Sequence, residues 1–275
     1  MALKEFADCW RRYHRANAHY TAIAEQWRQL IEEEPYETSL KVDDDGSGRI
    51  AIYATYEPLP EIFGLELGEM LYQLRAALDH VIYATAVRET GQDPPPDHDV
   101  LEFPITMSPD AFQRAAWKIA PLSEEFRPLI EWVQPYNADK VPEPGNVLNT
   151  SLGLLHEWAR IDRHRRLHVI GSWAAEAKPK LRLPEGVRVV NMEVGEAGFL
   201  NVDRDIATFK LEGWRPGMKV EGNPDVMISI AVNEPPYPDA AAPDLAQRCG
   251  PMLSAMESLI RVFEDGLTKR PPKTR

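Results

Sequence analysis

The stretch EIFGLELGEMLYQLRAALDHVIYATAVRE, residues 61–89, decides the fold. On a helical wheel of about 100° per residue, its apolar side chains cover most of the circumference. A helix that is apolar on nearly all sides is normally buried, so we predict that residues 61–89 form a central helix. The loop GQDPPPDHD follows it and carries the glycine and prolines that end helices.

Three further long helices are expected to surround the central one. In each of them apolar residues recur at three- and four-residue spacing, which is typical of a helix with one buried face. We predict these helices over residues 3–33, 147–165 and 243–267, and two short helices over 111–120 and 123–133. Gly250-Pro251 is expected to kink the last helix, because proline has no amide hydrogen for the helical hydrogen bond.

Strands are expected in two parts of the chain. SLKV and RIAIYATY alternate between apolar and polar residues around DDDGSG, which predicts a β-hairpin. Asp43, Asp44 and Asp45 in that turn are consecutive, whereas a calcium loop uses alternate positions, so a solvated turn is favoured. Between about residues 167 and 233, β-branched runs separated by Gly, Pro and Asp predict about five antiparallel strands.

The predicted fold class is therefore α+β. We expect a four-helix bundle with the hairpin between its first and second helices, and a small antiparallel sheet between its third and fourth. One domain is expected over residues 1–268, with the bundle in 1–166 and 241–268 and the β insertion in about 167–235. The basic tail, residues 269–275, is expected to be disordered.

Composition limits the classes of function. The net charge of −12 does not attract the whole chain to nucleic acid or to anionic membranes, so an RNA partner would need a local basic site. HEWARIDRHRRLH, residues 156–168, is such a segment. No apolar run approaches the ~20 residues of a membrane helix, and no secretory signal is visible. The two cysteines, Cys9 and Cys249, are expected to be reduced and packed, which indicates a cytoplasmic protein without a membrane partner.

Three polar residues of the central helix are candidates for chemistry. Arg75 and Asp79 lie about 40° apart on the wheel and can form an ion pair. His80 lies about 140° from Arg75, so an ideal helix does not direct both side chains to one point. A site that uses both needs another helix or another subunit.

The helix over 147–165 carries a second unusual group. Asp162 falls near the middle of its apolar face, where a carboxylate needs a partner. Arg166 at i+4 and Arg75 are the candidates. Arg75, Asp79, Asp162 and Arg166 would then form one buried ionic network that fixes the register between this helix and the central one.

A metal site is disfavoured. His164 and His168 have the spacing of paired zinc ligands on a helix, but arginines at 163, 165 and 166 lower the affinity for divalent cations. We favour a basic surface stripe that includes Arg160, and predict no metal and no cofactor. The chain also has no G-x-S-x-G turn, P-loop or dinucleotide-binding glycine pattern.

The segment Arg75-Ala-Ala-Leu-Asp-His80 resembles the Arg-x4-6-His motif of the HEPN superfamily, and Arg163 to His168 fits the same pattern. HEPN proteins are bundles of four or five helices, and many are metal-independent ribonucleases of toxin or antiphage systems. The chain also resembles uncharacterised bacterial proteins that share LR-x-ALDH and IDRHR-like segments.

The HEPN resemblance implies an endoribonuclease that works as a homodimer. His80 would be the general acid or base in attack of a ribose 2′-hydroxyl on the adjacent phosphate, Arg75 would bind that phosphate, and Asp79 would orient one of them. The expected RNA-binding residues are Arg160, Arg163, His164 and Arg165. An antitoxin or a regulatory protein is a further expected partner. The alternative is a non-catalytic interaction or ligand-binding protein that uses the groove between the second and third long helices.

Overall fold

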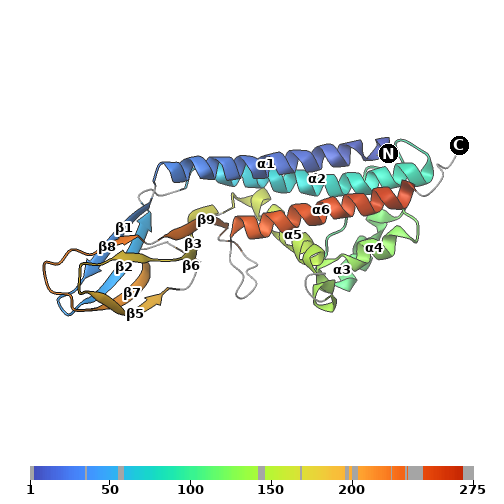
Figure 1. Cartoon of the computed structure of the whole chain (residues 1–275). Coiled ribbons are helices and arrows are strands. Elements are labelled where there is room, and N and C mark those ends of the chain that lie inside the picture. Colours follow the sequence, from blue (N-terminus) through green and yellow to red (C-terminus); the bar gives the residue numbers. More distant parts are fainter. Residues whose placement is uncertain are drawn as a thin grey trace.

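The computed structural model describes residues 3–34, 36–54, 59–141, 146–167, 169–195, 198–199, 204–223, 225–232, 234 and 244–268. The chain is α+β, as predicted, and it is elongated, with long helices along one part and the strands gathered at one end (Figure 1). No helix among the described residues has the length and apolar character needed to cross a membrane.

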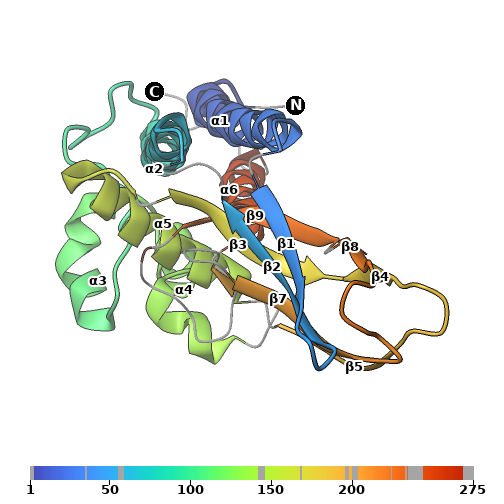
Figure 2. The same cartoon turned by 90° about the vertical axis from the view of Figure 1, so that its left-hand side faces the viewer.

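The predicted central helix is confirmed. α2 (Ile62–Thr90) buries residues on nearly every side and packs against three long helices, which are α1 (Ala7–Glu32), α5 (Val147–His164) and α6 (Leu245–Thr268). Figure 2 looks along α1 and α2 and shows them side by side. α2 ends at Gly91, whose φ of 67° is left-handed and whose amide donates to the carbonyl of Val87 at 2.9 Å. Glycine is preferred at this left-handed position because it has no Cβ atom that would clash there.

The helix boundaries differ from the predicted ones mainly at the short helices. A 3-10 turn, η1 (Lys4–Phe6), precedes α1. The helix predicted over 111–120 is divided into α3 (Pro109–Ala115) and η2 (Ala116–Ile119), and the one predicted over 123–133 is α4 (Phe126–Trp132). η3 (Pro135–Lys140) follows and was not predicted. α3 begins early because Ser108 caps it by accepting from the amide of Ala111 at 3.2 Å.

The hairpin is confirmed, but it is not a separate unit. β1 (Tyr36–Val42) pairs with β2 (Ser47–Ala54), and β2 continues into a four-stranded antiparallel sheet with β7 (Arg204–Glu212) and β5 (Arg188–Val194). The expected β insertion over 167–235 is therefore completed by strands that precede α2. A small core of Ile50, Val187, Phe209 and Leu211 joins the two segments.

The remaining strands are short or lie nearer the helices. β3 (Val169–Ala177) pairs with β6 (Gly198–Phe199) and β9 (Val226–Val232), and β4 (Lys180–Arg182) pairs with β8 (Glu221–Asn223). The described part of residues 167–233 thus holds more strands than the five predicted, because pieces of two or three residues are too short to show alternation.

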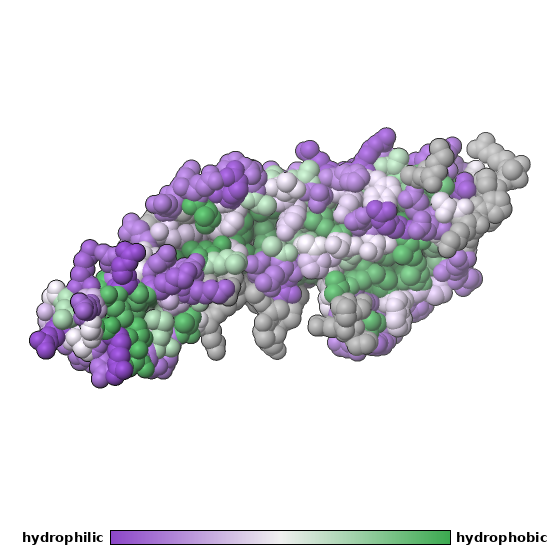
Figure 3. Space-filling view, in the orientation of Figure 1, coloured by the Kyte–Doolittle hydropathy of each residue, from purple (hydrophilic) through white to green (hydrophobic). Residues whose placement is uncertain are grey.

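Apolar side chains also reach the surface over both strands and helices (Figure 3).

The main core lies between the long helices and contains both cysteines. Cys9 and Cys249 are buried and free, as predicted, and burial raises the pKa of the Cys9 thiol to about 12. Pro251 lies inside α6. At the beginning of this helix, the carboxylate of Asp244 accepts a hydrogen bond from the amide of Gln247 at 3.0 Å. The predicted basic tail, residues 269–275, lies outside the described residues.

Candidate functional site

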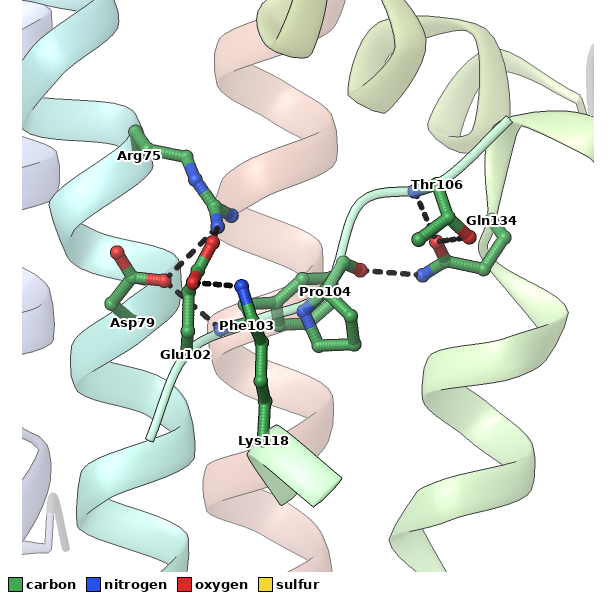
Figure 4. A network of polar contacts seen from close by, with 8 residues as sticks. All are labelled: Arg75, Asp79, Glu102, Phe103, Pro104, Thr106, Lys118 and Gln134. Carbon is green, nitrogen blue, oxygen red and sulfur yellow. Dashed lines mark hydrogen bonds and ion pairs between the residues drawn. The ribbon is translucent and has the colours of Figure 1, made fainter. Parts of the chain in front are cut away.

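Arg75 lies in a network of ion pairs between α2 and the extended segment that follows the proline-rich loop (Figure 4). Its Nη2 atom donates to Glu102 Oε1 at 2.6 Å and lies 3.4 Å from Asp79 Oδ1. Glu102 also accepts from Lys118 of η2. Two cations and two carboxylates therefore balance one another here.

The network fixes the path of the segment through residue 103. Asp79 Oδ1 accepts from the amide of Phe103 at 2.9 Å. Burial raises the pKa of Asp79, although Arg75 and that amide act in the opposite direction. Burial also acts to raise the pKa of Glu102, but Lys118 and Arg75 outweigh it and the net shift is downward. The ion pairs and hydrogen bonds thus outweigh the effect of burial at Glu102, but they offset it only in part at Asp79.

Gln134 holds the same segment from the other side (Figure 4). Its Oε1 accepts from the amide of Thr106 at 2.8 Å, and its Nε2 donates to the carbonyls of Pro104 and Ile130, each at 2.8 Å. The side chain is fully buried. Because both ends of the amide are bonded, Gln134 ties the segment to the end of α4.

His80 belongs to a different environment from Arg75. It is partly buried and faces the charges of Arg12 and Asp8 on α1. Burial lowers the pKa of His80, Arg12 lowers it further, and Asp8 and Asp79 act against them. Among the described residues no hydrogen bond or ion pair joins Arg75 and His80, as their 140° separation on the wheel leads one to expect. Within one chain, the motif is not assembled into a single site.

The expected four-residue network is not formed, and this corrects the sequence interpretation. Arg166 lies beyond the end of α5 and binds Glu61 at 2.9 Å instead of Asp162. The carboxylate of Asp162 lies over Gly68 of α2, where a Cβ atom would come within 2.5 Å of Oδ2. Burial raises the pKa of Asp162, and Glu69 adds to the shift. Glycine at position 68 is what permits this close approach of α5 to α2.

The expected RNA-binding residues fall into two groups. Arg160 is paired with Glu157, with Nε and Oε2 3.0 Å apart. Arg165 makes a two-bond pair with the buried Glu234, at 2.5 and 2.7 Å. Arg163 and His164 are exposed, whereas His168 lies outside the described residues. Half of the predicted basic stripe is therefore engaged by carboxylates of the same chain.

A cavity of about 620 Å³ lies between η3, α5 and the first turns of α6. Its apolar lining is contributed by Met107, Pro135, Ala138, Val147, Leu154 and Pro251. Its polar lining includes Asn149, Thr150, Ser151, His156, Glu157, Gln247 and Arg248. Met107 directly follows the segment that Arg75 and Gln134 hold, so the network also supports one wall of the cavity.

Several polar groups of the cavity are partly or fully buried. Asn149 is held by its Nδ2 atom, which donates to the carbonyls of Trp132 at 2.8 Å and Gln134 at 3.0 Å. Burial lowers the pKa of His156, and the charge of Arg75 lowers it further. Burial also lowers the pKa of the Arg248 guanidinium. The cavity thus combines an apolar wall with a few oriented or desolvated polar groups.

Sequence reasoning missed Glu102, Lys118, Gln134 and the cavity. A signal existed for Glu102, because an acid between Leu101 and Phe103 in an apolar extended stretch needs a cation. No local pattern could reveal the cavity, since its walls come from three distant segments.

Within the part of the chain that the structure describes, no group of three or more His, Cys, Asp or Glu side chains is arranged to hold a metal ion. Comparison with family models, with curated proteins and with solved structures finds no match to this chain.

Proposed function

We propose that this protein is a non-catalytic ligand-binding protein, in which Arg75 and Asp79 maintain the fold and the cavity between α5 and α6 receives a small molecule. The observation that carries the proposal is the commitment of Arg75 to Glu102 at 2.6 Å, on a different side of α2 from His80. A guanidinium that is already paired with carboxylates is a poor ligand for a substrate phosphate.

The cavity supports the binding part of the proposal. Small-molecule sites usually measure about 300–1,000 Å³ and are mostly apolar with a few placed polar groups. The volume of about 620 Å³ and the lining described above fit this pattern. We therefore place the binding site in the cavity between α5, α6 and η3, and not in the groove between α2 and α5 that the sequence suggested. We take α1, α2, α5 and α6 as one four-helix bundle that supports its walls.

The test compares Arg75→Met and His80→Gln with the wild type. We expect none of them to cleave labelled RNAs in EDTA, and we expect Arg75→Met to lower the free energy of unfolding by about 1–3 kcal/mol, because Glu102 and Asp79 lose their shared cation. Arg11→Gln is the matched control, since Arg11 is exposed and binds only the exposed Asp8 among the contacts described. EDTA-resistant cleavage that leaves cyclic-phosphate ends, and that both variants abolish, would overturn the proposal.

Ribonuclease activity is the second candidate, and His80 is the observation that favours it. Its pKa is lowered from 6.5, so the imidazole is neutral near pH 7 and is able to accept a proton. Arg12 supplies a nearby positive charge. This function would need RNA as a substrate and a second copy of the chain to bring an Arg75 to each His80, and a toxin would also need an antitoxin or another regulatory partner.

A further inference from the structure

We propose that the cavity between η3, α5 and α6 selects neutral molecules that combine an apolar body with a hydroxyl or N–H group, and that Asn149 Oδ1 accepts the hydrogen bond from that group. This inference rests on the ligand-binding function proposed above and names the class of ligand.

The side-chain amide of Asn149 is fixed in one orientation. Its Nδ2 atom carries two hydrogens and donates to two carbonyls, of Trp132 at 2.8 Å and of Gln134 at 3.0 Å. The reversed amide would direct Oδ1 at two carbonyl oxygens, which cannot donate. The nitrogen therefore faces the end of α4, and the oxygen occupies the other position of the amide.

Asn149 Oδ1 is an acceptor that has no donor within the described residues. Asn149 lines the cavity and is only 2% exposed. Its oxygen is not among the unpartnered polar atoms that are sealed from solvent, which include Trp158 Nε1. Since Asn149 borders the cavity, Oδ1 is the polar atom that it offers there. A buried acceptor without a partner is unfavourable, so a donor on the ligand complements it.

The ionisable groups of the lining do not favour a charged ligand. Glu157 is paired with Arg160 through two hydrogen bonds, of 3.0 and 2.5 Å. His156 is neutral near pH 7, because burial and the charge of Arg75 lower its pKa. Arg248 already interacts with another group of the chain, so we assign it no role toward the ligand. A charged ligand would lose hydration in this cavity without gaining a free counter-ion from the described lining.

The rest of the lining suits an apolar body with neutral polar groups. His156 follows Asn149 by seven residues, so the two lie on one face of α5. The buried Ser151 adds a hydroxyl group. Apolar surface comes from Met107, Pro135, Val147 and Leu154.

The experiment compares three probes that share one ring system. 2-Naphthol has a hydroxyl donor, 2-methoxynaphthalene has the same oxygen without the hydrogen, and 2-naphthoate is an anion. Isothermal titration calorimetry at pH 7 measures their affinities for the full chain. We expect 2-naphthol to bind about three- to tenfold more tightly than 2-methoxynaphthalene, which corresponds to one neutral hydrogen bond, and more tightly than 2-naphthoate.

The pH dependence of the wild type tests the acceptor without a substitution. Phenolic hydroxyls ionise at about pH 10, and the resulting naphtholate has no hydrogen to donate to Asn149 Oδ1. The affinity for 2-naphthol should therefore fall as pH rises through this ionisation, whereas the affinity for 2-methoxynaphthalene should stay level. An unchanged affinity for 2-naphthol over this range would refute the proposal.

Asn149→Leu removes the acceptor. This variant should bind 2-naphthol and 2-methoxynaphthalene equally, whereas Arg11→Gln, the exposed control on α1, should keep the preference. Asn149 also contacts the end of α4, so folding is checked by circular dichroism, and the pH series decides if the variant does not fold. Thr150→Trp should weaken both neutral probes, because Thr150 is an exposed residue of α5 at the cavity wall.

The outcomes separate this inference from the proposed function. Equal affinities of the wild type for the two neutral probes, tighter binding of 2-naphthoate, or a folded Asn149→Leu that keeps the preference would refute the selection of neutral donors. Each of these results leaves the ligand-binding function intact. If no probe binds, or if a folded Thr150→Trp affects none of them, the cavity is not the ligand site and the proposed function fails as well.

Discussion

Replacing Gln134 with leucine is expected to lower the free energy of unfolding by about 2–3 kcal/mol. Gln134 is fully buried, and its amide bonds to Thr106, Pro104 and Ile130. Leucine fills a similar volume but can neither donate nor accept a hydrogen bond. The substitution therefore tests the polar clamp on this segment without creating a large cavity.

The magnitude follows from the groups left without partners. The carbonyls of Pro104 and Ile130 lie in buried residues, and each unpaired buried group costs about 1–3 kcal/mol. The amide of Thr106 costs less, because this residue is only partly buried and water can reach it. Burial of the leucine side chain returns about 1–2 kcal/mol. The sum leaves a net loss of about 2–3 kcal/mol.

Urea unfolding followed by circular dichroism measures this loss, with Gln113→Ala as the control because Gln113 is exposed on α3. The control should change stability by less than about 0.5 kcal/mol. Gln134→Glu gives a second readout. Its new carboxyl group would face two carbonyls, so its pKa is raised on folding and the variant should lose stability as pH rises. A Gln134→Leu protein as stable as the wild type would refute the clamp.

Three further outcomes are expected from the structure. Because the pKa of His80 is lowered on folding, stability should fall as pH drops below about 6.5, and His80→Gln should lose less between pH 7 and pH 5 in matched urea titrations. Arg165→Ala should destabilise the protein more than Arg163→Ala in the same assay, because only Arg165 neutralises a buried carboxylate. Gly68→Ala should lower the free energy of unfolding by about 1–3 kcal/mol, because its Cβ would meet the carboxylate of Asp162. Adding Asp162→Ala to the same chain should recover part of this loss, and no recovery would contradict the contact between Asp162 and Gly68.

The long helices could be predicted from sequence because their signals are local. The central helix was expected over residues 61–89 and spans Ile62–Thr90, since apolar periodicity and Gly91 mark its face and its end. The pairing of β2 with β7 had no such signal. Ile50 lies opposite Ala207, more than a hundred residues away, and many strands with the same alternation could have taken that place.

In the candidate site, too, contacts within one helix could be predicted from the sequence, and contacts between distant segments could not. The pairing of Arg75 with Asp79 follows from helix geometry, because residues four apart lie on neighbouring positions of one face. The stronger contact of Arg75, with Glu102, depends on the path taken by a segment after a proline-rich loop. Asp162 lies on the face of α5 that is directed toward α2, as its position in the apolar stripe predicts. Its neighbour there is Gly68, however, and not the expected cation.

The contacts of Arg75 make it a poor site for an anion. For a phosphate to use Arg75, the guanidinium would have to leave Glu102, which costs about 1.5–3 kcal/mol for a charge-assisted bond and weakens the hold on Phe103 through Asp79. Its Nη1 atom is buried and has no hydrogen-bond partner among the described residues, so that donor is not presented to solvent. A phosphate therefore meets a cost at Arg75, although Arg75 is the residue that the sequence motif singles out.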